Sequence, residues 1–179
     1  MFERYSERSR RIIFFARYEA LQYGSPVIAP EHVLLGLLRE DKTVVGRFFP
    51  FRPDIGTDKI RAEVEERVVV RDRIPQSSEL QLSTETKKVL FYASEESRKQ
   101  KARLIGPEHI LVGLLREERS VAAEILIQFG LRAQDVRIEF GRRNIEGTNF
   151  TPVKKEPSKT PNVTEFTRDL TQLAADGKF

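Results

Sequence analysis

Two copies of one motif carry the residues that could do chemistry. The copies are PEHVLLGLLRE at residues 30–40 and PEHILVGLLRE at residues 107–117, with nine of eleven positions identical. Each places a glutamate directly before a histidine, and both residue types serve as general acids or bases in enzymes. Covalent catalysis would also need a nucleophile beside the base. The chain has no cysteine, and the serine that both repeats share, Ser6 and Ser83, is the expected cap of a helix. We therefore predict no catalytic site and interpret His32 and His109 as capping or packing residues.

The same composition argues against a metal or cofactor. With two histidines and no cysteine, a closed zinc site would have to use carboxylates. Glu31 and Glu108 have two interpretations that the residues alone leave open. Each could take part in binding, or each could simply favour the start of a helix, where the macrodipole stabilises an acidic residue by about 0.3–1 kcal/mol. We expect no cofactor and no metal.

The duplication extends well beyond the motif. At a constant spacing of 77 residues, identical residues recur along both halves of the sequence. The matched pairs are Ser6 and Ser83, Phe14 and Phe91, Ala16 and Ala93, Glu19 and Glu96, Ile28 and Ile105, and Val44 and Val121. A repeat of this length indicates two copies of one folding unit.

Each unit begins with two predicted helices. The first helix of each unit starts after Ser6 or Ser83, and Gly24 is a typical helix end in the first unit. The second helix starts at a proline, Pro30 or Pro107, because proline is well tolerated at the first helical position. Leucines at i, i+3 and i+4 then give it an apolar stripe. The glycines inside these helices, Gly36 and Gly113, predict close approach of another helix.

The second half of each unit is less alike. A third helix is expected from about Thr43, interrupted by the prolines of FFPFRP at residues 48–53, whereas AAEILIQFGL runs to a glycine stop at Gly130. The fourth is predicted over Thr57–Val70, with Ile60, Val64 and Val68 on one face, and a shorter counterpart is expected around Val136 and Phe140. The predicted fold is all-α, with two four-helix repeats related by a pseudo-twofold axis, about eight helices in all.

The domain boundaries follow from composition. Residues 1–143 form the predicted domain, with repeat one at 1–70, a polar connector at 71–79 and repeat two at 80–143. Residues 144–162 are rich in Pro, Thr, Asn and Lys and are predicted to be a flexible linker. Residues 163–179 regain weak helical periodicity through Phe166, Leu170 and Leu173.

Charge and hydropathy exclude other classes of function. The net charge is +4 with 32% charged residues, and the basic residues alternate with glutamates, so no concentrated field for nucleic acid is expected. No segment has the apolar length of a membrane span or a signal peptide. We expect a cytoplasmic protein that is a monomer in isolation.

A duplicated helical unit with the motif EHxLxGLLRE resembles the N-terminal domain of the Clp/Hsp100 unfoldases. The opening MFERYSERSRRII is most similar to the ClpC-type branch, and TEFTRDLTQLAADGK at 164–178 resembles the segment that leads into a first Clp ATPase domain. The sequence contains no G-x-x-x-x-G-K-[ST] phosphate loop. The resemblance fits either a piece of an unfoldase or a free-standing protein, and we favour the free-standing protein.

The resemblance also implies binding residues. In ClpC-type domains the motif glutamate takes part in recognising phosphorylated arginine on clients, which points to Glu31 and Glu108. The family usually has threonine before this glutamate, whereas Pro30 and Pro107 stand here and remove a hydroxyl and a backbone donor. A ligand-accepting cleft between the repeats would be lined by Phe2, Arg10, Leu82 and Lys87, with Leu82 where the family often has phenylalanine.

Two functions are therefore expected as alternatives. The first is a module that binds client or adaptor proteins, in company with a Clp ATPase hexamer. The second is a standalone regulator that uses the same fold for an unrelated partner or a small ligand. The aromatic run at 48–53 could be an exposed patch for a partner or part of a repacked core.

Overall fold

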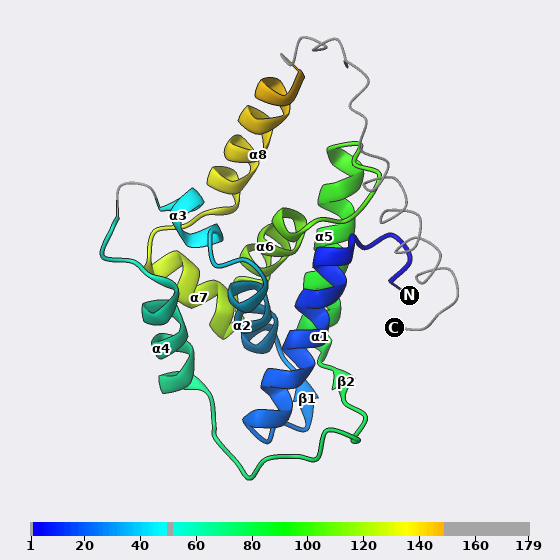
Figure 1. Cartoon of the computed structure of the whole chain (residues 1–179), viewed down its shortest axis with the longest axis vertical. Coiled ribbons are helices and arrows are strands. Elements are labelled where there is room, and N and C mark those ends of the chain that lie inside the picture. Colours follow the sequence, from blue (N-terminus) through cyan, green and yellow to red (C-terminus); the bar gives the residue numbers. More distant parts are fainter. Residues whose placement is uncertain (1, 50–51, 149–179) are drawn as a thin grey trace, which may run out of the picture. The chain divides into compact units, whose positions relative to one another are not determined.

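Within residues 2–49 and 52–148, the part of the chain that this computed structural model describes, eight helices and two short strands follow one another (Figure 1). Repeat one contains α1 (Glu7–Gln22), β1 (Val27–Ile28), α2 (Pro30–Glu40), α3 (Val44–Phe48) and α4 (Thr57–Arg67). Repeat two contains β2 (Gln81–Leu82), α5 (Thr84–Lys99), α6 (Pro107–Arg116), α7 (Val121–Gln128) and α8 (Ala133–Thr148). The predicted all-α class and the number of helices are confirmed.

The first helix of each repeat begins where the sequence predicts it. The hydroxyl of Ser6 accepts a hydrogen bond from the Ser9 amide across 3.2 Å, and the hydroxyl of Ser83 accepts one from Thr86 across 3.1 Å. Gly24 follows α1 with a positive φ of 67°, a conformation that favours glycine at a helix end. These local bonds satisfy amides that the first turn of a helix leaves without partners.

The two internal glycines allow the first and second helices of each repeat to touch. A Cβ atom on Gly36 would lie 2.4 Å from the carbonyl oxygen of Ile12 in α1. The equivalent atom on Gly113 would lie 2.4 Å from the carbonyl oxygen of Val89 in α5. Since these neighbours are backbone atoms, only glycine fits, and the predicted packing role is confirmed.

The repeats are joined by reciprocal strand pairing. β1 and β2 are parallel, with Ile28 opposite Leu82, and the Ser83 amide donates to the Ile28 carbonyl across 3.0 Å. At the positions 77 residues away, Tyr5 forms a parallel bridge with Ile105, and the Ser6 amide donates to the Ile105 carbonyl across 3.0 Å. Each repeat therefore gives the other the same backbone contact, as expected for a pseudo-twofold relationship.

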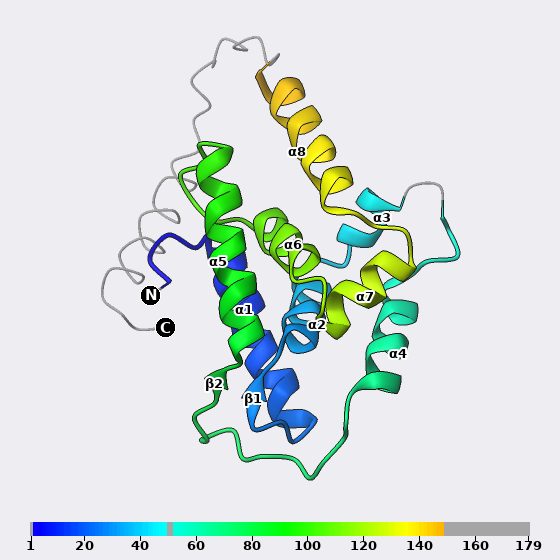
Figure 2. The same ribbon diagram turned by 180° about the vertical axis from the view of Figure 1, so that it is seen from behind.

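One core runs through both repeats. Figures 1 and 2 show α2, α6 and α7 in the centre of the helical domain, with α4 on one side and α1 and α5 on the other. The central helices supply fully buried aliphatic side chains, including Leu34, Leu37, Ile110, Leu114 and Ile125. Burying a side chain of this size contributes about 1.5–3 kcal/mol, so the two repeats stabilise one another.

The aromatic run of repeat one joins this core. α3 ends at Phe48, two residues before Pro50, as expected from the steric restriction that proline places on the preceding residue. Phe49 is 9% exposed, and Phe48 packs partly buried against the core. The repacked-core alternative therefore holds for these two rings, whereas Phe51 lies outside the described residues.

The fourth helices differ from the prediction. α4 ends at Arg67, so the expected helix to Val70 is too long, and Val69 and Val70 are exposed. The expected shorter counterpart in repeat two is wrong, because α8 has 16 residues against 11 in α4. Ion pairs from Arg142 and Arg143 to Glu139 support the continuation of α8 past Gly141.

The predicted linker falls largely outside the structure. α8 continues to Thr148, so residues 144–148 at the start of the expected linker are helical. The rest of the predicted linker and the segment 163–179 lie outside the described residues.

Candidate functional site

The motif histidines close the start of their own helices. The Ala29 amide donates to Nδ1 of His32 across 2.9 Å, and the Gly106 amide donates to Nδ1 of His109 across 2.8 Å. Nδ1 must be unprotonated to accept these bonds, so both rings are neutral and carry their proton on Nε2. In repeat two Nε2 lies 2.9 Å from the Gln100 side chain. The sequence-based interpretation of capping histidines is confirmed.

Burial keeps these imidazoles neutral. It lowers the pKa of His32 to about 4, and the charge of Glu19 raises it only partly. Burial also lowers the pKa of His109, against smaller opposing effects from Glu108 and Glu96. A histidine that is buried and committed to a backbone amide is poorly placed to shuttle protons.

A buried carboxylate ties three helices together in each repeat, which the sequence reasoning missed. Glu19 on α1 is 3% exposed and accepts hydrogen bonds from Arg39 on α2 across 3.1 Å and from Arg61 on α4 across 3.0 Å. Glu96 on α5 is 1% exposed and pairs with Arg116 on α6 across 3.2 Å and Arg137 on α8 across 2.6 Å. The recurrence of Glu19 as Glu96 was the available signal. These clusters fix the helices that carry the motif.

Glu31 lies in the first turn of α2 and is partly buried. Burial raises the pKa of its carboxyl group, its own backbone amide lowers it, and the like charge of Glu85 on α5 raises it again. Among the residues that the structure describes, Glu31 makes no ion pair. The Glu31 carboxylate therefore lies near a second negative charge, that of Glu85.

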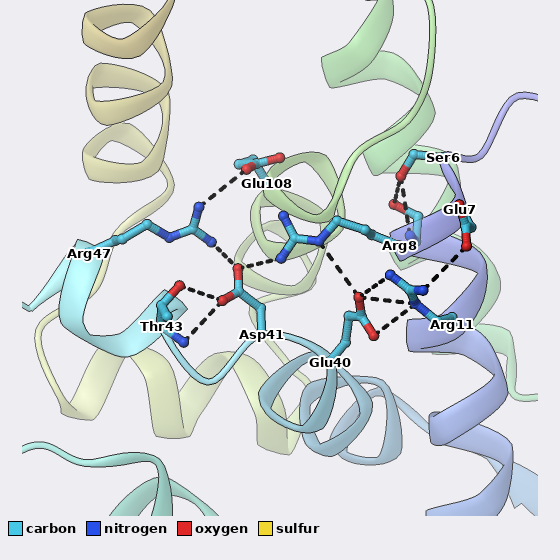
Figure 3. A network of polar contacts seen from close by, with 10 residues as sticks. Ser6, Glu7, Arg8, Arg11, Glu40, Asp41, Thr43, Arg47 and Glu108 are labelled. Atoms are coloured by element: carbon cyan, nitrogen blue, oxygen red, sulfur yellow. Dashed lines mark hydrogen bonds and ion pairs between the residues drawn. The ribbon is translucent and has the colours of Figure 1, made fainter. Parts of the chain in front are cut away.

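Glu108 occupies the equivalent place on α6 in a different setting. Its Oε1 atom lies 3.7 Å from Nη1 of Arg47, a residue of α3 in repeat one. Figure 3 shows that Arg47 also pairs with Asp41, which binds Nη2 of Arg8 across 2.8 Å and the hydroxyl of Thr43 across 2.6 Å. Glu108 thus belongs to a network between the repeats.

The electrostatics of this network centre on Asp41. Burial alone would raise the pKa of Asp41, but hydrogen bonds from Thr43 and Arg8 and the charge of Arg47 outweigh burial and lower it. Asp41 is 4% exposed. A buried, ionised carboxylate with three partners holds the guanidinium of Arg47 in a fixed position.

A groove of about 360 Å³ lies beside the strand pairing. Three of the four predicted residues line it: Phe2, Leu82 and Lys87. Arg10 does not, because its guanidinium donates to the backbone carbonyls of Phe2 and Glu3 across 3.3 and 3.4 Å. The sequence analysis missed the remaining lining residues, which are Ile13, Phe14, Arg17, Ile28, Leu80 and Gln81.

The groove is largely apolar and partly open. Phe14 is 63% exposed, and the Phe2 ring packs edge-on against Tyr5 at a centroid distance of 5.2 Å. Phe91, which matches Phe14 in repeat two, is 58% exposed but does not line the groove. Exposed aromatic rings beside a hollow are typical of a surface that binds a partner.

Residues 2–49 and 52–148 contain no group of three or more His, Cys, Asp or Glu side chains that could hold a metal ion. None of the described helices is long and apolar enough to cross a membrane.

Comparison with known sequences places the chain in a family. The family model described as "Clp repeat (R) N-terminal domain" matches residues 4–129 and 81–175. The chain is 32% identical over 184 residues to the "ATP-dependent Clp protease ATP-binding subunit ClpA homolog" of Porphyra purpurea, covering 99% of this chain and 22% of that protein. It is 31% identical over 179 residues to the "Negative regulator of genetic competence ClpC/MecB" of Bacillus subtilis, covering 98% and 22%. The chain thus spans about a fifth of the length of these relatives.

Solved structures of Clp and Hsp104 N-terminal domains are similar to this chain. The N-terminal domain of the chaperone ClpD from Arabidopsis thaliana is 30% identical with a TM-score of 0.63, covering 81% of this chain and 97% of that one. The Hsp104 N-terminal domain from Candida albicans, at 20% identity and a TM-score of 0.61, covers 76% and 89% and supports the fold alone. The chain therefore belongs to the Clp repeat N-terminal domain family.

Proposed function

We propose that this chain is a protein-binding module that recognises client or adaptor proteins for a Clp-type unfoldase. The observation that carries the proposal is the groove of about 360 Å³ between the repeats, with the exposed Phe14 ring on its wall. Relatives named as ATP-binding subunits of a Clp protease support the unfoldase partner. An apolar groove with an aromatic anchor suits an extended or helical segment of another protein.

The charges around the groove favour an acidic segment. Arg17 and Lys87 line the groove, and Arg10 lies beside Phe2. In the part of the chain that the structure describes, none of these three cations pairs with a carboxylate, since Arg10 and Arg17 donate to backbone carbonyls. A client segment with apolar residues flanked by Asp or Glu would complement both the groove and its rim.

Fluorescence anisotropy with two labelled peptides tests this proposal. Both peptides carry the same leucines and phenylalanines, and one places glutamates between them while the other places lysines. We expect the acidic peptide to bind at least about tenfold more tightly, a difference of about 1.4 kcal/mol. Phe14→Glu should abolish this binding. Phe91→Glu, which changes an equally exposed phenylalanine outside the groove, is the matched control.

The outcomes separate clearly. Loss of binding in Phe14→Glu alone supports the groove as the client site. Equal loss in both variants, or no preference between the two peptides, contradicts it. Circular dichroism of each variant checks that the helices remain intact.

A second binding mode is proposed for the motif carboxylates. We infer that Glu31 and Glu108 contact the guanidinium of phosphorylated arginine on client proteins, as the family resemblance implies. The Glu31 carboxylate is partly buried and forms no ion pair with another described residue, which supports this. Pro30 and Pro107 leave fewer donors for the phosphoryl group, so we expect modest affinity.

Calorimetric titration with a phosphoarginine peptide, its unmodified counterpart and free phosphoarginine tests this mode. Binding that needs the phosphoryl group and disappears in the Glu31→Ala, Glu108→Ala double variant supports it. Absence of binding with all three ligands leaves the groove as the client site.

A further inference from the structure

Tyr5 and Leu82 occupy equivalent positions in the two repeats. Tyr5 lies opposite Ile105 just before α1. Leu82 lies opposite Ile28 just before α5. The two contacts correspond at the spacing of 77 residues that relates the repeats. The two side chains therefore start from equivalent backbone positions, but one carries an aromatic ring and the other is a shorter aliphatic chain.

The ring of Tyr5 is buried against α5. Tyr5 is 7% exposed, and its hydroxyl donates to the backbone carbonyl oxygen of Leu90 across 3.5 Å. Leu90 itself is 4% exposed. On this side of the pseudo-twofold axis, the chain therefore covers the long helix of the other repeat with an aromatic ring of its own.

The equivalent space beside α1 is open. Ile13 of α1, which matches Leu90, is only partly buried and lines the groove of about 360 Å³ together with Leu82. A hollow of about 150 Å³ with an apolar lining is already large enough to hold a benzene ring. Because Leu82 is shorter than Tyr5, the groove has room for one more aromatic ring, which a partner can supply.

The walls of the groove suit such a ring. Phe2 and the exposed Phe14 both line it. An aromatic ring packed beside another adds roughly two- to tenfold in affinity beyond the area that it buries. The Ile13 carbonyl oxygen is the counterpart of the acceptor that the Tyr5 hydroxyl uses. At 3.5 Å that hydrogen bond is long and weak, so the ring and not a hydroxyl should decide the affinity of a ligand.

We propose that Leu82 determines the specificity of the groove by leaving it open for one aromatic side chain, phenylalanine or tyrosine, of a client or adaptor segment. This inference rests on the proposed function of the groove and names the anchor residue that the segment must carry. Lys87, the exposed counterpart of Arg10, lines the same groove, so acidic residues should flank the anchor.

Fluorescence anisotropy with a series of labelled peptides tests the anchor. The peptides share the same glutamates and differ at one central position, which is tyrosine, phenylalanine, leucine or alanine. With the full chain, we expect the tyrosine and phenylalanine peptides to bind within about threefold of each other. Both should bind at least about fivefold more tightly than the leucine peptide, and the alanine peptide should bind most weakly.

Leu82→Tyr is the variant that closes the groove. The new ring should take the place that the client ring needs, and it should weaken binding of the tyrosine and phenylalanine peptides by at least about tenfold. Leu104→Tyr is the matched control, because Leu104 is a 45% exposed leucine that does not line the groove. Circular dichroism and thermal unfolding check that both variants fold.

Leu82→Ala tests the same residue in the opposite direction. The shorter side chain enlarges the groove, so a peptide with the larger indole ring of tryptophan as its anchor should bind better. Relative to the wild-type protein, the affinity ratio of the tryptophan peptide to the tyrosine peptide should rise by at least about fivefold. This result decides the role of Leu82 even where Leu82→Tyr fails to fold.

Other outcomes contradict the inference in different ways. Equal affinities for all four anchors in the wild-type protein, or tight aromatic binding that persists in folded Leu82→Tyr, overturn the role of Leu82 and leave the groove as the client site. An unchanged affinity ratio in Leu82→Ala, or an equal loss of binding in Leu104→Tyr and Leu82→Tyr, also overturns it. No binding of any peptide to the wild-type protein overturns this inference together with the proposed function of the groove.

Discussion

Glu19 and Arg39, 20 positions apart in the sequence, form an ion pair whose Oε1 and Nε atoms lie 3.1 Å apart. The pair joins α1 to α2, and Glu96 and Arg116 repeat it between α5 and α6 across 3.2 Å. Both carboxylates are nearly inaccessible to solvent. The duplicated pair therefore holds each motif helix against the long helix that precedes it.

Replacing Glu96 by glutamine should destabilise the domain by about 2 kcal/mol, because charge-assisted hydrogen bonds are lost and Arg116 and Arg137 lose their partner. Urea unfolding at pH 7 measures the loss. Glu95→Gln, at a 34% exposed carboxylate that also pairs with Arg116, should cost less than about 1 kcal/mol. Equal losses would show that burial of Glu96 contributes nothing.

Glu96 also predicts a response to acid. The hydrogen bond from Arg137 lowers the pKa of Glu96 below its ordinary value of 4.5, against the effect of burial. The native state therefore binds this proton less readily than the unfolded state. Its contribution is complete above about pH 4.5 and is lost as pH falls through the lower native pKa. In Glu96→Gln, the urea midpoint should fall less steeply below pH 4.5 than in the wild-type protein.

His32 affects the stability of the protein at a higher pH than Glu96 does. Its pKa falls from 6.5 to about 4 on folding. Between these two pH values His32 is therefore protonated in the unfolded state and neutral in the native state. Stability should decline as pH falls from about 6.5 to 4, by up to about 3 kcal/mol. His32→Gln keeps an acceptor for the Ala29 amide without the titrating ring and should flatten this part of the profile. An unchanged slope would contradict the assignment.

Gly36→Ala should destabilise the protein by about 2 kcal/mol. Alanine is the better helix former by about 1 kcal/mol, but its Cβ atom would lie 2.4 Å from the Ile12 carbonyl oxygen, and α1 would have to move. Gly46→Ala in α3 is the control, because no neighbour lies within 4 Å of its Cβ position. The thermal midpoint should fall in Gly36→Ala and hold or rise in Gly46→Ala. The reverse order would contradict the packing argument.

The rim of the groove predicts a salt-dependent interaction. Lys87→Glu should weaken binding of the acidic peptide by about tenfold and make it less sensitive to salt, because a favourable charge becomes a repulsive one. Lys88→Glu changes the net charge equally at an exposed neighbour that does not line the groove. Anisotropy titrations at two salt concentrations compare them. Similar losses in both variants would indicate an effect of net charge alone.

The sequence by itself determined the duplication, the helical class and most helix ends. These features depend on short stretches of chain: Ser6 bonds an amide three residues on, and Gly24 takes its left-handed conformation beside the helix that it ends. Gly36 and Gly113 were also interpretable, because a glycine inside an apolar helix already indicates a close neighbour.

Only the tertiary structure determines which charged side chains lie next to each motif carboxylate. Glu31 and Glu108 stand in nearly identical sequences, yet Glu85 acts on the first, and Arg47 pairs with the second. Those neighbours come from the other repeat, and no periodicity along the chain encodes which distant side chains converge. The groove has the same origin, since Phe14 and Leu82 belong to different repeats. Local spacing sets a helix, whereas a site arises from residues that only the packing of the repeats brings together.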